Sequence, residues 1–146
     1  MSITVLIDAG PLGMISNPKA TATNRECYDW LEALVVSGAR VFVPEIADYE
    51  VRRELLRAGK TQGIARLDLI KNTIGYISIT TSVMLKAAEL WAEARRSGMP
   101  TADRKELDCD VILAAQALAI NGIVATENVG HLSRFVDAKH WRDIKS

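Results

Sequence analysis

Acidic residues stand where apolar segments of this sequence end or begin. Asp8 directly follows the apolar, largely β-branched residues 3–7, and Asp108 and Asp110 lead into a segment rich in alanine and leucine. Asn128 comes shortly after another short apolar segment. Mg²⁺ and Mn²⁺ prefer oxygen ligands, and clustered carboxylates repel one another unless a cation neutralises them. These residues therefore predict a site for Mg²⁺ or Mn²⁺ if the fold brings them together.

A further acid, Glu50, lies in a segment dense in charges of both signs, roughly residues 45–58. This segment is predicted to be a helix whose inward stripe consists of Ile46, Tyr49 and Leu56. Glu50 would then lie beside the stripe. Most of the other charges are those expected of a solvated helix face. Glu50 becomes a candidate ligand only in combination with Asp8.

This set of acids suits phosphodiester chemistry better than the other common hydrolytic mechanisms. Two divalent ions held close together can activate a water and stabilise the leaving oxygen in phosphodiester cleavage. The only histidines are His131 and His140, both late in the chain, so no Ser-His-Asp grouping is indicated. The sequence also lacks a glycine-rich phosphate loop.

Each acid also has a purely structural interpretation. Asp8 is followed by Gly10-Pro11 and would suit a turn. An aspartate at the start of a helix caps free N–H groups, which explains one of Asp108 and Asp110 well. Because each helical residue turns by about 100°, the pair cannot point in one direction, so one would cap and the other bind metal. The sequence leaves open which of the two is the ligand.

Predicted strands and helices alternate along the chain, which favours an α/β fold with a mostly parallel central sheet of four to five strands. The expected strands are residues 3–7, 40–43, 76–79 and 123–125. The expected helices are residues 22–37, 45–58, 61–72, 81–96 and 108–120, with a polar connection over residues 101–106. Active sites of open parallel sheets collect beyond the carboxyl ends of the strands, where Asp8 and Asn128 would lie. One domain, residues 1–146, is expected.

The overall charge is balanced, with 18 basic and 18 acidic residues, so only local charge can attract a nucleic acid. Arg52 and Arg53 flank Glu50 and are predicted to bind substrate phosphates. Thr126, at the end of the last predicted strand, is predicted to contact the substrate as well.

No segment of the sequence predicts a membrane protein. The longest apolar runs fall short of the roughly 20 residues that span a bilayer, and the N-terminus has no signal-peptide pattern. Cys27 and Cys109 lack metal-like spacing and are expected to be reduced, near-core residues. A cytoplasmic location is therefore expected.

Four ordered segments give the chain a resemblance to the PIN-domain ribonucleases, and within them to the VapC-type toxins of bacterial toxin–antitoxin pairs. The segments are residues 6–12, 44–57, 110–117 and 126–132. Asp8, Glu50 and Asp110 stand where the family has its first three metal-binding acids. Asn128 stands in the last motif, a Thr-x-Asn/Asp turn.

The resemblance implies a PIN-like three-layer sandwich and Mg²⁺- or Mn²⁺-dependent cleavage of RNA, with Asp8, Glu50 and Asp110 as catalytic and metal-binding residues. Asn128 departs from the family's frequent Asp and is a neutral, weaker ligand, so Asp108 is a candidate for the missing charge. We therefore expect a single tightly held ion, with any second ion arriving alongside the substrate. The resemblance also implies a small antitoxin partner and a homodimer.

Two other functions are compatible with these residues. A catalytically degenerate PIN domain would bind RNA or a partner protein without cleaving anything, and Asn128 is the motivation for this alternative. A different metal-dependent phosphoesterase on a related scaffold would act on DNA ends or nucleotides.

Overall fold

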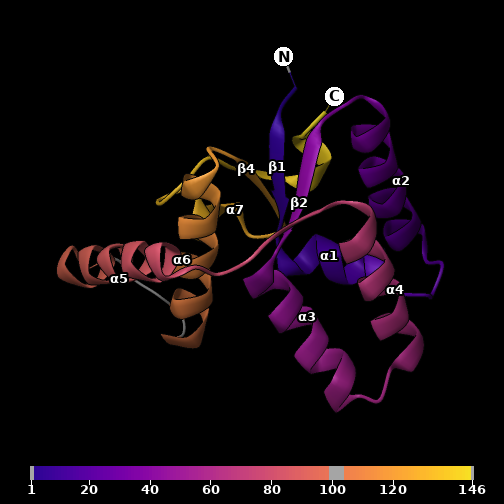
Figure 1. Ribbon diagram of the computed structural model, residues 1–146, viewed down its shortest axis with the longest axis horizontal. Helices are drawn as coiled ribbons and strands as arrows, with labels where there is room; N and C mark the ends of the chain where they lie inside the picture. The colour runs from indigo at the N-terminus through magenta and orange to yellow at the C-terminus, as the bar shows by residue number, and fades with distance from the viewer. Residues whose placement is uncertain (1, 99–103, 146) are drawn as a thin grey trace.

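The computed structural model describes residues 2–98 and 104–145, which form a five-stranded sheet with helices on both sides (Figure 1). The strands are β1 (Thr4–Ile7), β2 (Arg40–Pro44), β3 (Gly75–Ile77), β4 (Ile123–Thr126) and β5 (Ala138–His140). They are ordered β3-β2-β1-β4-β5, and all neighbours are parallel. The predicted α/β fold is confirmed. The short β5 was not expected from the sequence.

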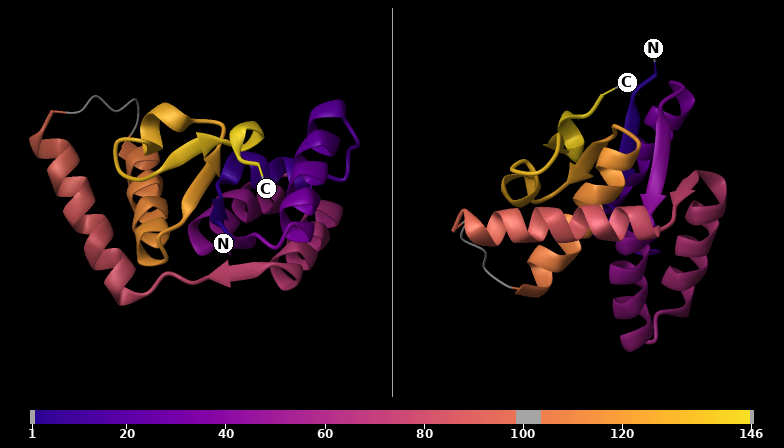
Figure 2. Two further views of the ribbon diagram at one scale, coloured as in Figure 1. Left: turned by 90° about the horizontal axis from the view of Figure 1, so that it is seen from above. Right: turned by 60° about the vertical axis from the view of Figure 1, so that its left-hand side comes forward.

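Side chains of the central strand alternate between the two faces of the sheet, as the pleat requires. Val5 and Ile7 are fully buried against α1 (Ala9–Ser16) and α2 (Ala22–Val36). Leu6 is buried on the opposite face, against α6 (Arg104–Ala119) and α7 (Val129–Leu132). The two views in Figure 2 show this central sheet between its two groups of helices, so the predicted three-layer sandwich is confirmed.

Helices α3 (Glu45–Arg57) and α4 (Thr61–Thr73) form a hairpin that extends beyond the carboxyl ends of β1 and β2 (Figure 1). Gly59 makes the turn between them at φ +66°, a conformation that favours glycine. The predicted inward stripe of α3 is wrong in two positions, because Tyr49 is 54% and Leu56 is 62% exposed. The buried residues of this helix are Ile46, Ala47, Asp48 and Val51.

Helix α5 (Thr81–Arg96) packs along α6 rather than on the sheet and projects to the left in Figure 1. Its inner face consists of Val83, Ala87, Leu90 and Ala94. Met84, Leu85 and Trp91 remain exposed on the outer face. In the described part of the chain, no helix combines the length and apolar character needed to cross a bilayer.

Two helix boundaries differ from the sequence prediction near the acidic residues. Helix α1 begins immediately after Asp8, where only a turn was expected. Residues 99–103 of the predicted polar connection lie outside the described residues, but the chain is already helical from Arg104. Asp108 and Asp110 therefore lie inside α6 rather than at its start, and the capping role considered for one of them is wrong.

Candidate functional site

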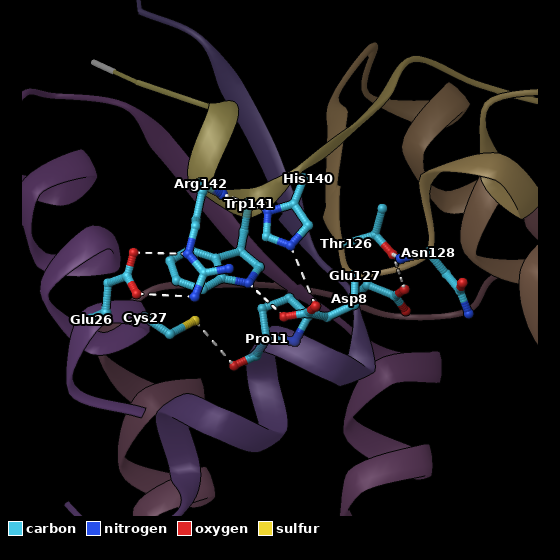
Figure 3. Close-up of polar contacts among 10 residues, drawn as sticks. All are labelled: Asp8, Pro11, Glu26, Cys27, Thr126, Glu127, Asn128, His140, Trp141 and Arg142. Atoms are coloured by element: carbon cyan, nitrogen blue, oxygen red, sulfur yellow. Dashed lines mark hydrogen bonds and ion pairs between the residues drawn. The ribbon is translucent and has the colours of Figure 1, made fainter. Parts of the chain in front are cut away.

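Asp8 lies at the carboxyl end of β1 and is held by hydrogen bonds to both carboxylate oxygens. Its Oδ1 accepts from the backbone N–H of Ala9 at 2.7 Å, which makes Asp8 the N-cap of α1. The Thr126 hydroxyl, at the end of β4, donates to Oδ2 at 2.7 Å (Figure 3). Loss of solvation by burial raises the pKa of Asp8, and these two hydrogen bonds oppose the rise. Two adjacent parallel strands thus fix the orientation of this carboxylate.

Glu50 of α3 and Asp110 of α6 lie close enough to Asp8 for its charge to act on both of them. Burial, followed by the negative charge of Asp8, raises the pKa of Glu50 to about 7. The same two causes, in the same order, raise the pKa of Asp110 to about 6. The Cys109 thiol donates a hydrogen bond to Glu50. The structure therefore brings Asp8, Glu50 and Asp110 together as three half-buried acids that sense one another's charge.

The character of these three acids fits a divalent cation. Each of the three has a raised pKa. The charge of Asp8 contributes to the rise for Glu50 and Asp110, and the charge of Asp110 contributes to the rise for Glu50. A bound cation would remove that repulsion, and carboxylate oxygens are the donors that Mg²⁺ and Mn²⁺ prefer. Residues 2–98 and 104–145 contain no ready-made group of three His, Cys, Asp or Glu ligands. The fit therefore rests on charge and donor type rather than on a preformed cage.

The other two predicted ligands occupy different positions. Asp108 is exposed, whereas Asp110 is half-buried and within electrostatic reach of Asp8. Of the two acids in α6, Asp110 is thus the better candidate for a ligand. Asn128 is exposed next to Thr126, and its backbone N–H donates to the Thr126 hydroxyl at 2.9 Å. Its side chain does not cap α7, so its amide oxygen can still serve as a neutral ligand.

Of the three predicted substrate-binding residues, two are engaged in contacts within the protein and one is exposed. The Arg52 guanidinium bridges Asp48 at 2.9 Å and Asp68 at 2.7 Å, so its charge is already used within α3 and α4. Arg53 is exposed beside Glu50 and lies 5.0 Å from the centre of the Tyr49 ring. Thr126 is fully buried and bonded to Asp8. This geometry favours a positioning role for Thr126 and leaves Arg53 as the arginine able to meet a substrate.

Several neighbours of the acids were not predicted. His131 and Arg134 lie near Asp110, and their positive charge opposes the rise of its pKa. Glu127 turns away from Asp8, and its Oε1 accepts from the Trp141 indole N–H at 2.7 Å (Figure 3). Trp141 is 1% exposed, so it fixes the backbone next to Thr126 from the C-terminal segment. The late histidines and tryptophan were visible in the sequence, but nothing in their spacing linked them to β4.

Comparisons with known proteins agree with this geometry. The family model described as PIN domain matches residues 15–135, a segment that contains Glu50, Asp110 and Asn128 and begins after Asp8. No protein with curated annotation matches the chain in sequence.

Three solved structures illustrate the likeness of the fold. A chain of VapBC2 from Rickettsia felis, bound to a DNA fragment from the promoter, has a TM-score of 0.76 and 18% identity over 95% of this chain and 99% of that chain. A chain of FitAcB from Neisseria gonorrhoeae has a TM-score of 0.71 and 17% identity over 96% of this chain and 99% of that chain. Mycobacterium tuberculosis VapC20, a toxin that cleaves the sarcin–ricin loop, has a TM-score of 0.64 and 13% identity over 91% of this chain and 97% of that chain. At such low identity these likenesses show the fold alone.

Proposed function

Because this chain belongs to the PIN-domain family, we propose that it is an endoribonuclease that hydrolyses RNA phosphodiester bonds with Mg²⁺ or Mn²⁺. The observation that supports this most strongly is the grouping of Asp8, Glu50 and Asp110, three acids with raised pKa values at the carboxyl ends of the strands. The resemblance of VapC20, an RNA-cleaving toxin, supports the choice of RNA.

The side chains of the site divide the work between holding a cation and exchanging a proton. Asp8, Glu50 and Asp110 would hold the ion, with Asn128 as a neutral fourth donor. When bound, a divalent ion polarises the phosphate and favours ionisation of the attacking water. Thr126 keeps Oδ2 of Asp8 in a fixed direction through its 2.7 Å hydrogen bond. Glu50, whose pKa is about 7 in the metal-free protein, would release its proton as the ion binds.

We further propose that the protein acts as a VapC-type toxin with a small antitoxin partner, and as a homodimer. Several similar chains come from VapBC complexes, which supports the antitoxin. The exposed Met84, Leu85 and Trp91 of α5 support a self-association surface. Cys27 and Cys109 are free thiols, as suits a protein that meets RNA in the cytoplasm. Sedimentation of the purified chain tests the dimer, and co-purification with the product of a neighbouring short reading frame tests the antitoxin.

The decisive experiment compares cleavage of a mixed RNA pool by the wild type and by Asp8→Asn, each with Mg²⁺, Mn²⁺ or EDTA. We expect metal-dependent cleavage that is lost in the variant. Asn keeps one acceptor oxygen, which can cap the N–H of Ala9 or accept from Thr126 but not both, so the melting temperature of the variant is measured alongside its activity. A well-folded wild type that cuts RNA with neither metal would favour the degenerate domain, and Asn128→Asp would then be the first change to restore activity. Parallel DNA and nucleotide substrates test for a different phosphoesterase.

A further inference from the structure

An open cleft of about 900 Å³ includes Glu50 of the acidic site and runs along α3 to the turn before α4. Glu50 and Arg53 lie at its inner end, and Lys19 and Lys60 line its outer part. Helix α1 forms the opposite wall, where Gly13 presents bare backbone, since a Cβ there would meet nothing within 4 Å. The cleft thus joins Glu50, one of the proposed catalytic acids, to a region of positive charge.

The cationic side chains of this cleft are available to an external anion. Lys19 and Lys60 are exposed, and neither forms an ion pair with any described residue. The backbone of Lys19 is nevertheless fixed, because its N–H donates to Asn17 and its C=O accepts from Asn24, each at 3.0 Å. Glu54, another acid of the cleft, is paired with Arg57 at 2.9 Å. The outer part of the cleft therefore holds two unpaired ammonium groups without a competing free carboxylate.

Arg53 adds a third positive charge to the lining of the cleft, beside Glu50. It is exposed, and the Tyr49 ring holds it next to Glu50. Its charge lowers the pKa of Glu50, although it is outweighed by burial and by Asp8. A strand that entered from Lys19 and Lys60 would thus have its phosphates neutralised by basic side chains as far as Glu50. Beyond that point a bound cation would neutralise them.

We propose that this cleft is the track of one RNA strand, with Lys19, Lys60 and Arg53 binding phosphates on one side of the cleaved bond. This proposal rests on the proposed function, because it takes Asp8, Glu50 and Asp110 to be the site of cleavage. A volume of about 900 Å³ lies within the range of sites for small ligands, so the cleft has room for a few nucleotides of a single strand. Unpaired ammonium groups favour phosphates because their attraction requires no particular base.

The test measures binding of a short single-stranded RNA in EDTA, by fluorescence anisotropy at several salt concentrations. Lys19→Ala combined with Lys60→Ala should weaken binding several-fold and reduce the slope of log affinity against log salt by about 1.4, which is roughly 0.7 per phosphate contact. The matched control combines Lys86→Ala with Lys139→Ala, two exposed lysines that are not part of the cleft. The control should bind like the wild type, and equal melting temperatures would confirm that both double variants fold.

Cleavage assays in Mn²⁺ separate this proposal from the proposed function. For an active nuclease, the Lys19/Lys60 variant should raise KM for RNA while leaving kcat nearly unchanged. Cleavage with an unchanged KM would overturn the RNA track and leave the nuclease standing. RNA binding that depends on these lysines without any cleavage would support the track and reject the nuclease. Three results would each overturn the track. The wild type could fail to bind RNA, or the control variant could lose as much RNA affinity as the Lys19/Lys60 variant. The Lys19/Lys60 variant could also lose affinity only for a polyglutamate peptide, used as an acidic polymer without phosphates, and not for RNA.

Discussion

Two acids on the same helix, two residues apart, have opposite surroundings. Asp48 of α3 is 6% exposed, and its carboxylate meets Arg52 at 2.9 Å and Lys71 at 3.4 Å. Glu50 is half-buried beside Asp8 and Asp110, and its pKa rises to about 7. The first acid is neutralised within the fold, whereas the second faces other acids.

We interpret this difference as one between an acid that maintains the structure and acids that are candidates for binding a ligand. A buried carboxylate with positive partners stabilises the fold only while those partners remain. A carboxylate beside other carboxylates raises the free energy of the folded chain, so its position is explained by something that binds there. Residue type alone does not make this distinction, because both residues are acids of a charged helix.

The largest expected effect comes from Glu50→Gln, which removes a charge from the acidic group. We expect RNA cleavage to fall by about 10²–10⁴-fold, because the neutral amide would bind the cation less strongly and the cation contributes several kcal/mol to the reaction. Stability without metal should be unchanged or higher, since a repulsive charge is lost. Cleavage rates and urea denaturation in EDTA measure the two effects. A clear loss of stability in EDTA would contradict this view of Glu50.

Asp48→Asn is the matched change at the neutralised acid. It leaves the charges of Arg52 and Lys71 less well compensated, so the free energy of unfolding should fall by about 1.5–3 kcal/mol. Cleavage by the folded protein should change far less than in Glu50→Gln. The same denaturation and cleavage assays apply. If Asp48→Asn cost as much activity as Glu50→Gln, the distinction between the two acids would be lost.

Thr126→Val tests how strongly the site depends on the orientation of Asp8. The change removes the donor to Oδ2 and should lower kcat by about 10–100-fold, as is typical for groups that orient metal ligands. KM for RNA should stay constant, because Thr126 is fully buried. Thr126→Ser keeps the hydroxyl and should retain most activity. A raised KM with normal kcat would instead favour the substrate contact that the sequence suggested.

The approximate positions of β1 to β4 and the place of Asp8 could be predicted from the sequence, because an apolar β-branched segment followed by an acid has a clear physical meaning in a parallel sheet. The start of α6 could not. Its first turn, from Arg104, is as polar as a loop, and only packing on the core distinguishes the two. The prediction that Asp108 and Asp110 open this helix failed for that reason.

The burial of individual acids was the other part that the sequence could not provide. Which face of α3 turns inward depends on α4 and the sheet, so the pattern suggested Tyr49 as an inward residue and missed Asp48. The hydrogen bond between Glu127 and Trp141 likewise depends on the C-terminal segment returning to β4 through the three-residue β5. Such contacts are set by tertiary packing, and local periodicity carries little information about them.

The last expected effect concerns stability rather than cleavage: it is the pH dependence of the free energy of unfolding without metal. The folded state raises the pKa of Glu50 from its ordinary 4.5 to about 7 and that of Asp110 from 3.8 to about 6. Between these values the folded chain binds more protons than the unfolded chain, so the free energy of unfolding should fall as pH rises from about 4 to about 7.

A divalent cation should reverse this trend, because its binding requires the ionised carboxylates and stabilises the folded state. Urea denaturation at about pH 5 and about pH 8, with EDTA or Mn²⁺, measures both effects, and Glu50→Gln should show a shallower dependence in EDTA. Asp48→Asn should keep the dependence of the wild type on this pH range. If Asp48→Asn flattened the pH dependence and Glu50→Gln did not, our distinction between the two acids would be wrong. The cation would then be expected near Asp48, where Arg52 and Lys71 already supply positive charge.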